Sequence, residues 1–143
     1  SDLGRASRKG APDTFDVHGY LALLERLRHQ RLDEVIYAPM FDRDLDAAIA
    51  GAIAVLPQTR LVITEGNYLL TDLRPWSSVR QSLDECWYLT VDDDWRRKKL
   101  LRRHMQHGRT LAQAESWIAS TDEPNAALIA RDRHRANHVV RWT

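Results

Sequence analysis

The chain has 143 residues, 43% of them apolar, so it can bury a hydrophobic core without help from metals or disulfides. Its 21 Lys and Arg residues balance 20 Asp and Glu residues, and a net charge of +1 gives no overall attraction to nucleic acid or to an anionic membrane. The single cysteine, Cys86, cannot form an internal disulfide, and no apolar run approaches the roughly 18 residues that span a bilayer. We therefore expect one globular, cytoplasmic domain that binds neither nucleic acid nor membranes.

The first half of the chain predicts two amphipathic helices separated by a short strand. Apolar residues recur at three- and four-residue spacing over residues 17–30, behind a capping residue, Asp16. The same spacing over residues 45–56, which Pro57 ends, predicts the second helix. Between them, residues 34–39 are rich in β-forming residues and stop at a proline, which is typical of a brief strand or an extended connection.

The second half predicts buried strands alternating with helices. Residues 61–66 and 87–91 are continuous apolar or β-branched runs, the pattern of strands buried on both faces of a sheet. We expect helices over residues 95–106, 111–120 and 125–135, and a last short strand over residues 138–142. Buried strands joined by helices form right-handed parallel crossovers, so we predict an α/β fold with a parallel sheet and flanking helices. Ligands of such sheets gather at the carboxyl ends of the strands.

Glu65 is the first candidate functional residue, because it closes a predicted buried strand and is followed at once by Gly66 and Asn67. A carboxylate at this end of a parallel strand lies in the ligand crevice, where burial is unfavourable unless it has a partner. Mg²⁺ prefers oxygen ligands and commonly binds through one or two carboxylates together with phosphate oxygens. Glu65 is therefore a candidate magnesium ligand and catalytic residue. The alternative is a glutamate that caps the following turn.

The second candidate is a dense basic run, RRKKLLRRHMQHGRT, at residues 96–110. In a phosphate-transferring enzyme, arginines on such a segment bind phosphate oxygens and neutralise the charge of the transition state, and the segment can close as a lid. The alternatives are a solvated helix face and a nucleic-acid patch. The six histidines show no metal-ligand spacing, so we expect no zinc site.

A third group of candidates lies in two polar segments. The loop RKGAPDTFD, residues 8–16, leads into the first helix, and loops on α/β scaffolds often carry ligand contacts. The segment YAPMFDRD, residues 37–44, places aromatic rings beside a charge pair, as a pocket for a small polar ligand needs. The alternative for this second segment is a turn at its charge pair with both aromatic rings in the core. The candidate substrate-binding residues are Arg8, Lys9, Asp13, Tyr37, Phe41, Asp42 and Arg43.

These segments, in order with VITEGNYLL at residues 62–70 and WIASTDEPNAALI at residues 117–129, resemble P-loop kinases of the uridine kinase, pantothenate kinase and phosphoribulokinase group. The strongest resemblance is to bacterial nucleoside/nucleotide kinase-like proteins and fructose-transport-system kinases, and it covers nearly the whole chain. It implies a P-loop NTPase fold, ATP and Mg²⁺ as cofactors, and phosphorylation of a hydroxyl on a small metabolite. It also implies that Glu65 is the magnesium-associated acid and that residues 96–110 are the lid. The lid residues near the phosphates are then Lys99, Arg102, Arg103 and Arg109.

Two motifs of that group are missing from these 143 residues: a strand followed by Gly-x-x-x-x-Gly-Lys-Ser/Thr, which holds the nucleotide phosphates, and a second strand that ends in a catalytic aspartate. We therefore expect the chain to be the carboxyl-terminal portion of a longer kinase and to be inactive by itself. The alternative is a non-catalytic binding or regulatory module of kinase ancestry. Gly10 and Arg43 depart from uridine kinases, which favours an anionic sugar or a pantothenate-like acceptor. A homodimer is a candidate assembly.

Overall fold

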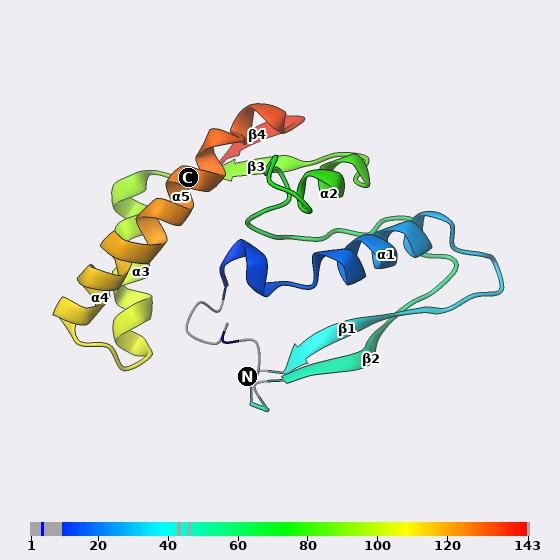
Figure 1. Ribbon diagram of the computed structural model, residues 1–143, viewed down its shortest axis with the longest axis horizontal. Helices are drawn as coiled ribbons and strands as arrows, with labels where there is room; N and C mark the ends of the chain where they lie inside the picture. Colours follow the sequence, from blue (N-terminus) through cyan, green and yellow to red (C-terminus); the bar gives the residue numbers. More distant parts are fainter. Residues whose placement is uncertain (1–3, 5–9, 43, 46, 143) are drawn as a thin grey trace. The chain divides into compact units, whose positions relative to one another are not determined.

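A computed structural model describes residue 4 and residues 10–42, 44–45 and 47–142 of the chain (Figure 1). The chain divides into two compact units, Ser1–Gly66 and Asn67–Thr143. Its organisation as a single domain stays a prediction. The elements in chain order are the 3₁₀ turn η2 (Pro12–Thr14), α1 (Val17–Arg28), β1 (Ile36–Asp42), β2 (Ala47–Val55), α2 (Ser77–Gln81), β3 (Trp87–Thr90), α3 (Asp93–Gln106), α4 (Leu111–Trp117), the π-helix η3 (Ile118–Asp122), α5 (Glu123–Arg131), the 3₁₀ turn η4 (Arg133–Arg135) and β4 (His138–Arg141).

Helix α1 begins where its capping residue predicts. The Asp16 carboxylate oxygen Oδ1 accepts a hydrogen bond from the Gly19 backbone N–H at 2.8 Å, which satisfies one of the donors that a first helical turn leaves free. Val17 and Leu24, on the apolar face of the helix, are buried. The helix predicted over residues 17–30 is therefore confirmed, with a slightly earlier end.

The helix predicted over residues 45–56 is wrong, because the structure pairs this segment with β1 as an antiparallel hairpin. The pairing begins with Ile36 opposite Val55, and the register shifts midway at a bulge. Gly51 lies in the extra stretch of β2 with a φ of +67°, a left-handed conformation that interrupts a helix. The apolar residues of this Ala- and Ile-rich segment have the spacing of a helix face. The segment is nevertheless a strand, because its backbone hydrogen-bonds to β1. The shorter strand predicted before it is present and longer, as β1.

Residues 61–66 form no regular strand, which corrects the prediction of a buried one. The side chains of Leu61 and Ile63 are 73% and 85% exposed. A strand needs a neighbouring backbone that exchanges hydrogen bonds with it, and no segment in the described part of the chain pairs with this one. One side chain is anchored, since the hydroxyl groups of Thr64 and Tyr20 are hydrogen-bonded at 2.9 Å.

Strands β3 and β4 pair in parallel, with Trp87 opposite His138 at the start of the register. This pairing confirms the strands predicted over residues 87–91 and 138–142. The side-chain oxygen of Asn137 accepts a hydrogen bond from the Cys86 backbone N–H at 2.8 Å, which fixes where the pairing begins. The expectation that β3 is buried on both faces is wrong, since Trp87 and Leu89 are 59% and 65% exposed. The reason is that β3 has only β4 as a paired neighbour among the described strands.

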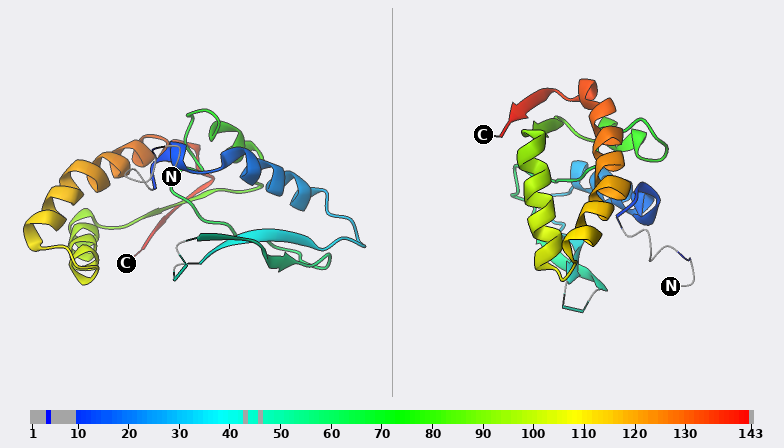
Figure 2. Two further views of the ribbon diagram at one scale, coloured as in Figure 1. Left: turned by 60° about the horizontal axis from the view of Figure 1, so that its bottom comes forward. Right: turned by 90° about the vertical axis from the view of Figure 1, so that its left-hand side faces the viewer.

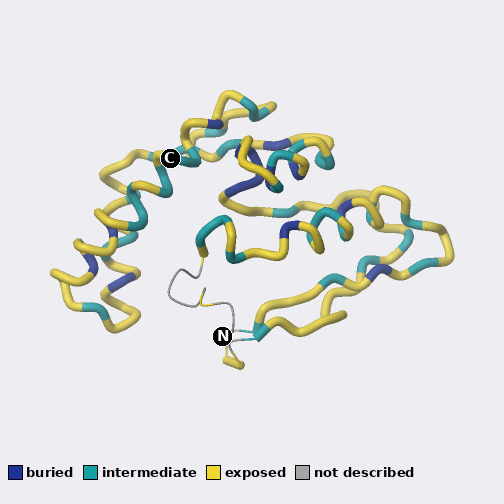
Figure 3. The backbone as a smooth tube through the Cα atoms, viewed as in Figure 1, coloured by how far each residue is buried: buried dark blue, intermediate teal, exposed yellow. Residues whose placement is uncertain are grey.

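Most of the buried apolar residues of the second unit lie in the segment before β3: Tyr68, Leu69, Leu70, Trp76, Val79 and Cys86. Ala114 on α4 and Ile118 on η3 are buried as well. The rings of Tyr68 and Trp76 pack with their centres 5.5 Å apart. Figure 3 shows this buried stretch in dark blue and the hairpin strands β1 and β2 exposed over most of their length. Burial raises the pKa of the Cys86 thiol, which suits the expectation that this residue serves packing.

The three helices predicted in the carboxyl-terminal half are present, with a difference at one junction: η3 joins α4 directly to α5, so that α4, η3 and α5 run as one rod beside α3 (Figure 2). Asp92 caps α3, accepting from the Trp95 backbone N–H at 2.9 Å. Thr110 caps α4 in a reciprocal capping box with Gln113. None of the helices in the described part of the chain combines the length and the apolar character that crossing a bilayer needs.

Candidate functional site

Glu65, the predicted metal ligand, lies exposed at the end of the first unit, directly before Gly66. No described residue forms a hydrogen bond or ion pair with its carboxylate, so the alternative role as a turn cap has no supporting contact. The described residues contain no group of three or more His, Cys, Asp or Glu side chains able to hold a metal ion. A magnesium ion at Glu65 would therefore complete its coordination with phosphate and water oxygens, which Mg²⁺ commonly does. The role of Glu65 stays a prediction.

Three candidate acceptor-binding residues, Tyr37, Phe41 and Asp42, lie on β1. Tyr37 and Phe41 are each about half exposed, which contradicts the alternative that places both rings in the core. Asp42 shapes the hairpin turn, because its Oδ1 accepts hydrogen bonds from the backbone N–H groups of Asp44 and Leu45 at 2.9 and 3.0 Å. Both aromatic rings are therefore accessible to a ligand, and Asp42 has a structural duty as well.

The other candidates on the acceptor side come from the loops. Asp13 is exposed in the 3₁₀ turn η2, just before the capped start of α1. Arg8, Lys9 and Arg43 lie outside the described residues. The binding role of the whole set stays a prediction.

Most of the basic run folds as α3, and two groups of its positively charged side chains differ in their partners. Arg96 and Arg97 both donate to Glu123 on α5, the first to Oε1 at 2.7 Å and the second to Oε2 at 3.1 Å. Both oxygens of this carboxylate are thereby occupied. Hydrogen bonds from Arg97 and Arg96 hold the pKa of Glu123 below its usual value. These two arginines tie α3 to α5 and serve the fold.

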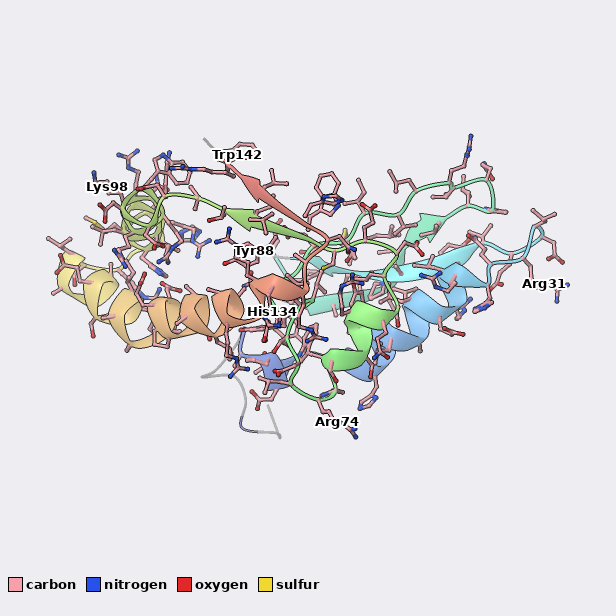
Figure 4. All side chains as sticks on the ribbon, turned by 90° about the horizontal axis from the view of Figure 1, so that it is seen from above. Arg31, Arg74, Tyr88, Lys98, His134 and Trp142 are labelled. Carbon is pink, nitrogen blue, oxygen red and sulfur yellow. The ribbon has the colours of Figure 1, made fainter. Side chains whose placement is uncertain are left out.

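Lys99, Arg102 and Arg103 form the second group, on one face of α3 because helical residues three and four apart are neighbours. All three are exposed, and no described carboxylate forms an ion pair with Arg102 or Arg103. Lys99 lies over the Trp95 ring, 5.0 Å from its centre. A shallow hollow of about 620 Å³ runs along the helix, lined by Lys98, Leu101, Arg102, Met105 and Gln106. Figure 4 shows Lys98 projecting from α3 into solvent. The exposed helix face that carries Lys99, Arg102 and Arg103 can bind a multiply charged anion.

Arg109, the last predicted lid residue, is partly buried and is held by its neighbours. Its Nη1 lies 2.6 Å from His104 Nδ1, and its guanidinium carbon lies 4.1 Å from the centre of the Trp117 ring. On the other side of the imidazole, Nε2 lies 2.7 Å from Asp122 Oδ2. Sequence reasoning did not single out His104, Trp117 or Asp122 as site residues. They lie far apart in the chain and share no periodic pattern, so only a search for His–Asp pairs across the predicted helices could have found them.

The predicted residues therefore gather in two places. Glu65 and the described acceptor-side residues belong to the first unit, and the candidate phosphate-binding cations belong to the second. Within the second unit, the structure brings Lys99, Arg102 and Arg103 onto one helix face and places Arg109 on the turn that follows.

Comparison with known proteins identifies the family to which the chain belongs. No protein-family model matches the chain. The ATP-dependent kinase-like protein notR' of Aspergillus versicolor is 37% identical over 137 residues, which cover 93% of this chain and 80% of that protein. The chain spans only about half the length of two further curated relatives, 48% of one and 54% of the other.

Two solved structures have the same fold. A Silicibacter sp. TM1040 protein assigned as a fructose transport system kinase superposes with a TM-score of 0.85 at 37% identity, over 99% of this chain and 66% of that one. YFH7 of Saccharomyces cerevisiae, assigned as a P-loop containing kinase, superposes with a TM-score of 0.81 over 99% of this chain and 51% of that one; at 22% identity this likeness concerns the fold alone. The α/β fold of P-loop kinase type is confirmed. Because the Aspergillus relative is matched over 80% of its length, this chain belongs to the P-loop kinase-like family.

Proposed function

We propose that the full-length protein containing this chain is an ATP- and Mg²⁺-dependent kinase that phosphorylates a hydroxyl group of a small metabolite in the cytoplasm. The observation that carries the proposal is the 37% identity, over 137 residues, to a protein named as ATP-dependent kinase-like. The acceptor is a nucleoside, a sugar or a pantothenate-like molecule. The name of the Silicibacter relative, which refers to fructose transport, keeps a sugar in this class.

The free cations of α3 suit the charge that phosphoryl transfer develops. In this reaction the transferred group spreads negative charge over its oxygens, and catalysis relies on positioning and charge neutralisation. Arg102 and Arg103 are exposed and have no carboxylate partner among the described residues, so they can form bidentate hydrogen bonds with phosphate without first breaking an ion pair. Lys99 on the same face adds a compact positive charge. Arg109 is the fourth cation in this proposed phosphate-binding set.

Glu65 supplies the oxygen ligand that a hard cation prefers. Its carboxylate is exposed and free of protein partners in the described part of the chain, so its chemistry fits a magnesium ion shared with phosphate oxygens. When bound, Mg²⁺ neutralises phosphate charge and orients the transferring group. On the acceptor side, the proposed contacts are Arg8, Lys9, Asp13, Tyr37, Phe41, Asp42 and Arg43.

The test is ATP turnover by the full-length gene product against a panel of nucleosides, sugars and pantothenate-like alcohols, with and without Mg²⁺. Glu65→Gln should lower kcat about a hundredfold, the loss expected on removing one group that stabilises the transition state. Its control is Glu25→Gln, which removes an exposed carboxylate on α1. Arg102→Ala should lower kcat/KM at least about tenfold. Its control is Arg141→Ala, which removes the same charge from an exposed position on β4, outside residues 96–110.

Two outcomes oppose the proposal. Full magnesium-dependent activity in Glu65→Gln would remove the metal role of this residue. The absence of both Mg·ATP binding and acceptor phosphorylation in the full-length protein would support the alternative of a non-catalytic binding module of kinase ancestry.

A further inference from the structure

His104 is the most buried histidine of the described chain and differs from the exposed ones in its contacts. Its residue is 8% exposed, and both ring nitrogens have side-chain partners, Arg109 at Nδ1 and Asp122 at Nε2. By contrast, His29 and His107 are exposed, and each ring hydrogen-bonds to a carbonyl one turn earlier in its own helix. Those two contacts finish helix ends, whereas His104 links the end of α3 to η3 and to the turn before α4.

The partners of His104 determine which nitrogen carries its proton. A guanidinium group has only donors, so the 2.6 Å contact with Arg109 requires a lone pair on Nδ1. The proton of the neutral ring is then on Nε2, where it is donated to the Asp122 carboxylate at 2.7 Å. Asp122 thus selects the tautomer whose other nitrogen accepts from Arg109. The same logic is known from metal-bound histidines, whose ring orientation a carboxylate fixes from behind.

Arg109 is held in place by three contacts. Its side chain donates to His104 and stacks on Trp117, and its backbone N–H donates to the His104 carbonyl at 3.2 Å. Gly108 immediately before it has a φ of +90°, which allows the tight turn between the two helices. Only one of the guanidinium N–H donors is used by these side-chain contacts. No other described residue accepts a hydrogen bond from this guanidinium, so its remaining donors can bind a ligand in an orientation that the imidazole sets.

We propose that His104 is a positioning residue: oriented by Asp122, it presents Nδ1 to Arg109 and fixes the direction in which this arginine offers its remaining donors to a phosphate group. The proposal rests on the proposed kinase function for the role of Arg109, and on the contacts above for the orientation itself. The charged side chains that form hydrogen bonds with the His104 ring in the described structure are Arg109, from the turn after α3, and Asp122, from η3.

The physical effect is the ordering of a flexible cation before its ligand binds. An arginine side chain loses rotamer entropy when it is fixed in one orientation. Contacts with His104 and Trp117 already restrict the Arg109 side chain in the free protein. A phosphate therefore binds a guanidinium that is oriented before binding. Without the imidazole acceptor, the arginine keeps its charge and loses its direction.

The first arm of the test does not depend on activity. In the full-length protein, long-range ¹H–¹⁵N spectra at neutral pH should assign the His104 proton to Nε2, and slowly rotating Arg109 Nη–H groups should be visible. His104→Gln keeps an acceptor and a donor on one side chain, and should retain the ordered Arg109 signals; His104→Leu should lose them. A proton on Nδ1, or equally ordered Arg109 signals in His104→Leu, would overturn the proposal.

The second arm measures phosphorylation in the same variants. His104→Leu should lower kcat/KM by about the same factor as Arg109→Ala, at least about tenfold, and the double variant should show no further loss because the two residues act as one unit. His104→Gln should recover most of the activity, and His134→Leu, an exposed control in η4 outside residues 96–110, should be unaffected. Additive losses in the double variant would refute the positioning role. If no variant of the protein phosphorylates any acceptor while the spectra behave as expected, the proposed function fails and the ordering of Arg109 stands.

Discussion

Replacing Glu123 by glutamine removes the charge that ties α3 to α5 and nearly preserves the shape of the side chain. Arg96 and Arg97 donate to its two oxygens at 2.7 and 3.1 Å, and the side chains of Glu123 and Arg96 are only 30% and 22% exposed. Exposed ion pairs contribute roughly 0.2–1 kcal/mol, and a mostly covered carboxylate shared by two arginines belongs at the upper end of that range. We therefore expect Glu123→Gln to lower the free energy of unfolding by about 1 kcal/mol at neutral pH.

The same ion pairs predict how this increment depends on pH. Since hydrogen bonds from Arg97 and Arg96 hold the pKa of Glu123 below its usual value, the folded protein favours the ionised carboxylate more than the unfolded chain does. The stabilisation is fully present above the pKa of the unfolded-state carboxyl and is lost as the pH falls through the lower folded-state pKa. Wild type and Glu123→Gln should therefore differ at pH 7 and converge in acid.

Urea unfolding of the full-length protein, followed by tryptophan fluorescence at neutral and acidic pH, measures this difference. The matched control is Glu115→Gln, an exposed glutamate on α4 with no ion pair among the described residues. The reasoning is refuted if Glu115→Gln has the same effect as Glu123→Gln, or if the difference between wild type and Glu123→Gln persists unchanged in acid.

Four further predictions concern the hairpin, a helix cap and the two ligands. Ile36→Ala should lower the free energy of unfolding by about 2–4 kcal/mol, because this fully buried side chain leaves a cavity; a loss of a few tenths in urea unfolding would contradict the packing. Thr110→Ala should cost about 1 kcal/mol by removing the capping box of α4, seen as faster hydrogen exchange of that helix alone. Arg43→Ala should raise the acceptor KM at least about tenfold if this cation binds an anionic acceptor, and an unchanged KM would exclude that role. Calorimetric titration of Mg·ATP into the 143-residue chain should show no micromolar binding, because the chain lacks the Gly-Lys-Ser/Thr phosphate cradle, and a micromolar Kd would mean that other residues hold the phosphates.

Local signals in the sequence were enough to locate several elements. The apolar stripe and the Asp16 cap predicted α1, and the basic amphipathic run predicted α3 almost to its ends. Both strands of the parallel pair β3–β4 were also expected from their short apolar composition. The family resemblance, read from several motifs in the same order, is likewise confirmed by the kinase-like relatives. Capping and helical periodicity act within a few residues, so a sequence can express them without knowledge of the fold.

Local signals did not predict which distant segments pair as strands. Residues 45–56 carry a helical pattern, yet the backbone of β1 offers them hydrogen-bond partners and Gly51 turns where a helix would continue. Residues 61–66 carry a strong strand pattern, yet the described chain gives them no partner, and their apolar side chains stay exposed. In both cases the amino acids permit more than one state, and the neighbouring backbone selects among them.

The candidate site divides in the same way. Composition alone identified a basic segment with phosphate-binding chemistry, and the roles assigned to Glu65 and to the lid residues remain predictions. Only the tertiary structure separated the arginines tied to Glu123 from Arg102 and Arg103, which are free of carboxylates among the described residues, and only the structure placed His104 between Arg109 and Asp122. The physical reason is that charge and hydrogen-bonding capacity belong to a residue type, whereas the partner that uses them is set by which helices the fold brings into contact.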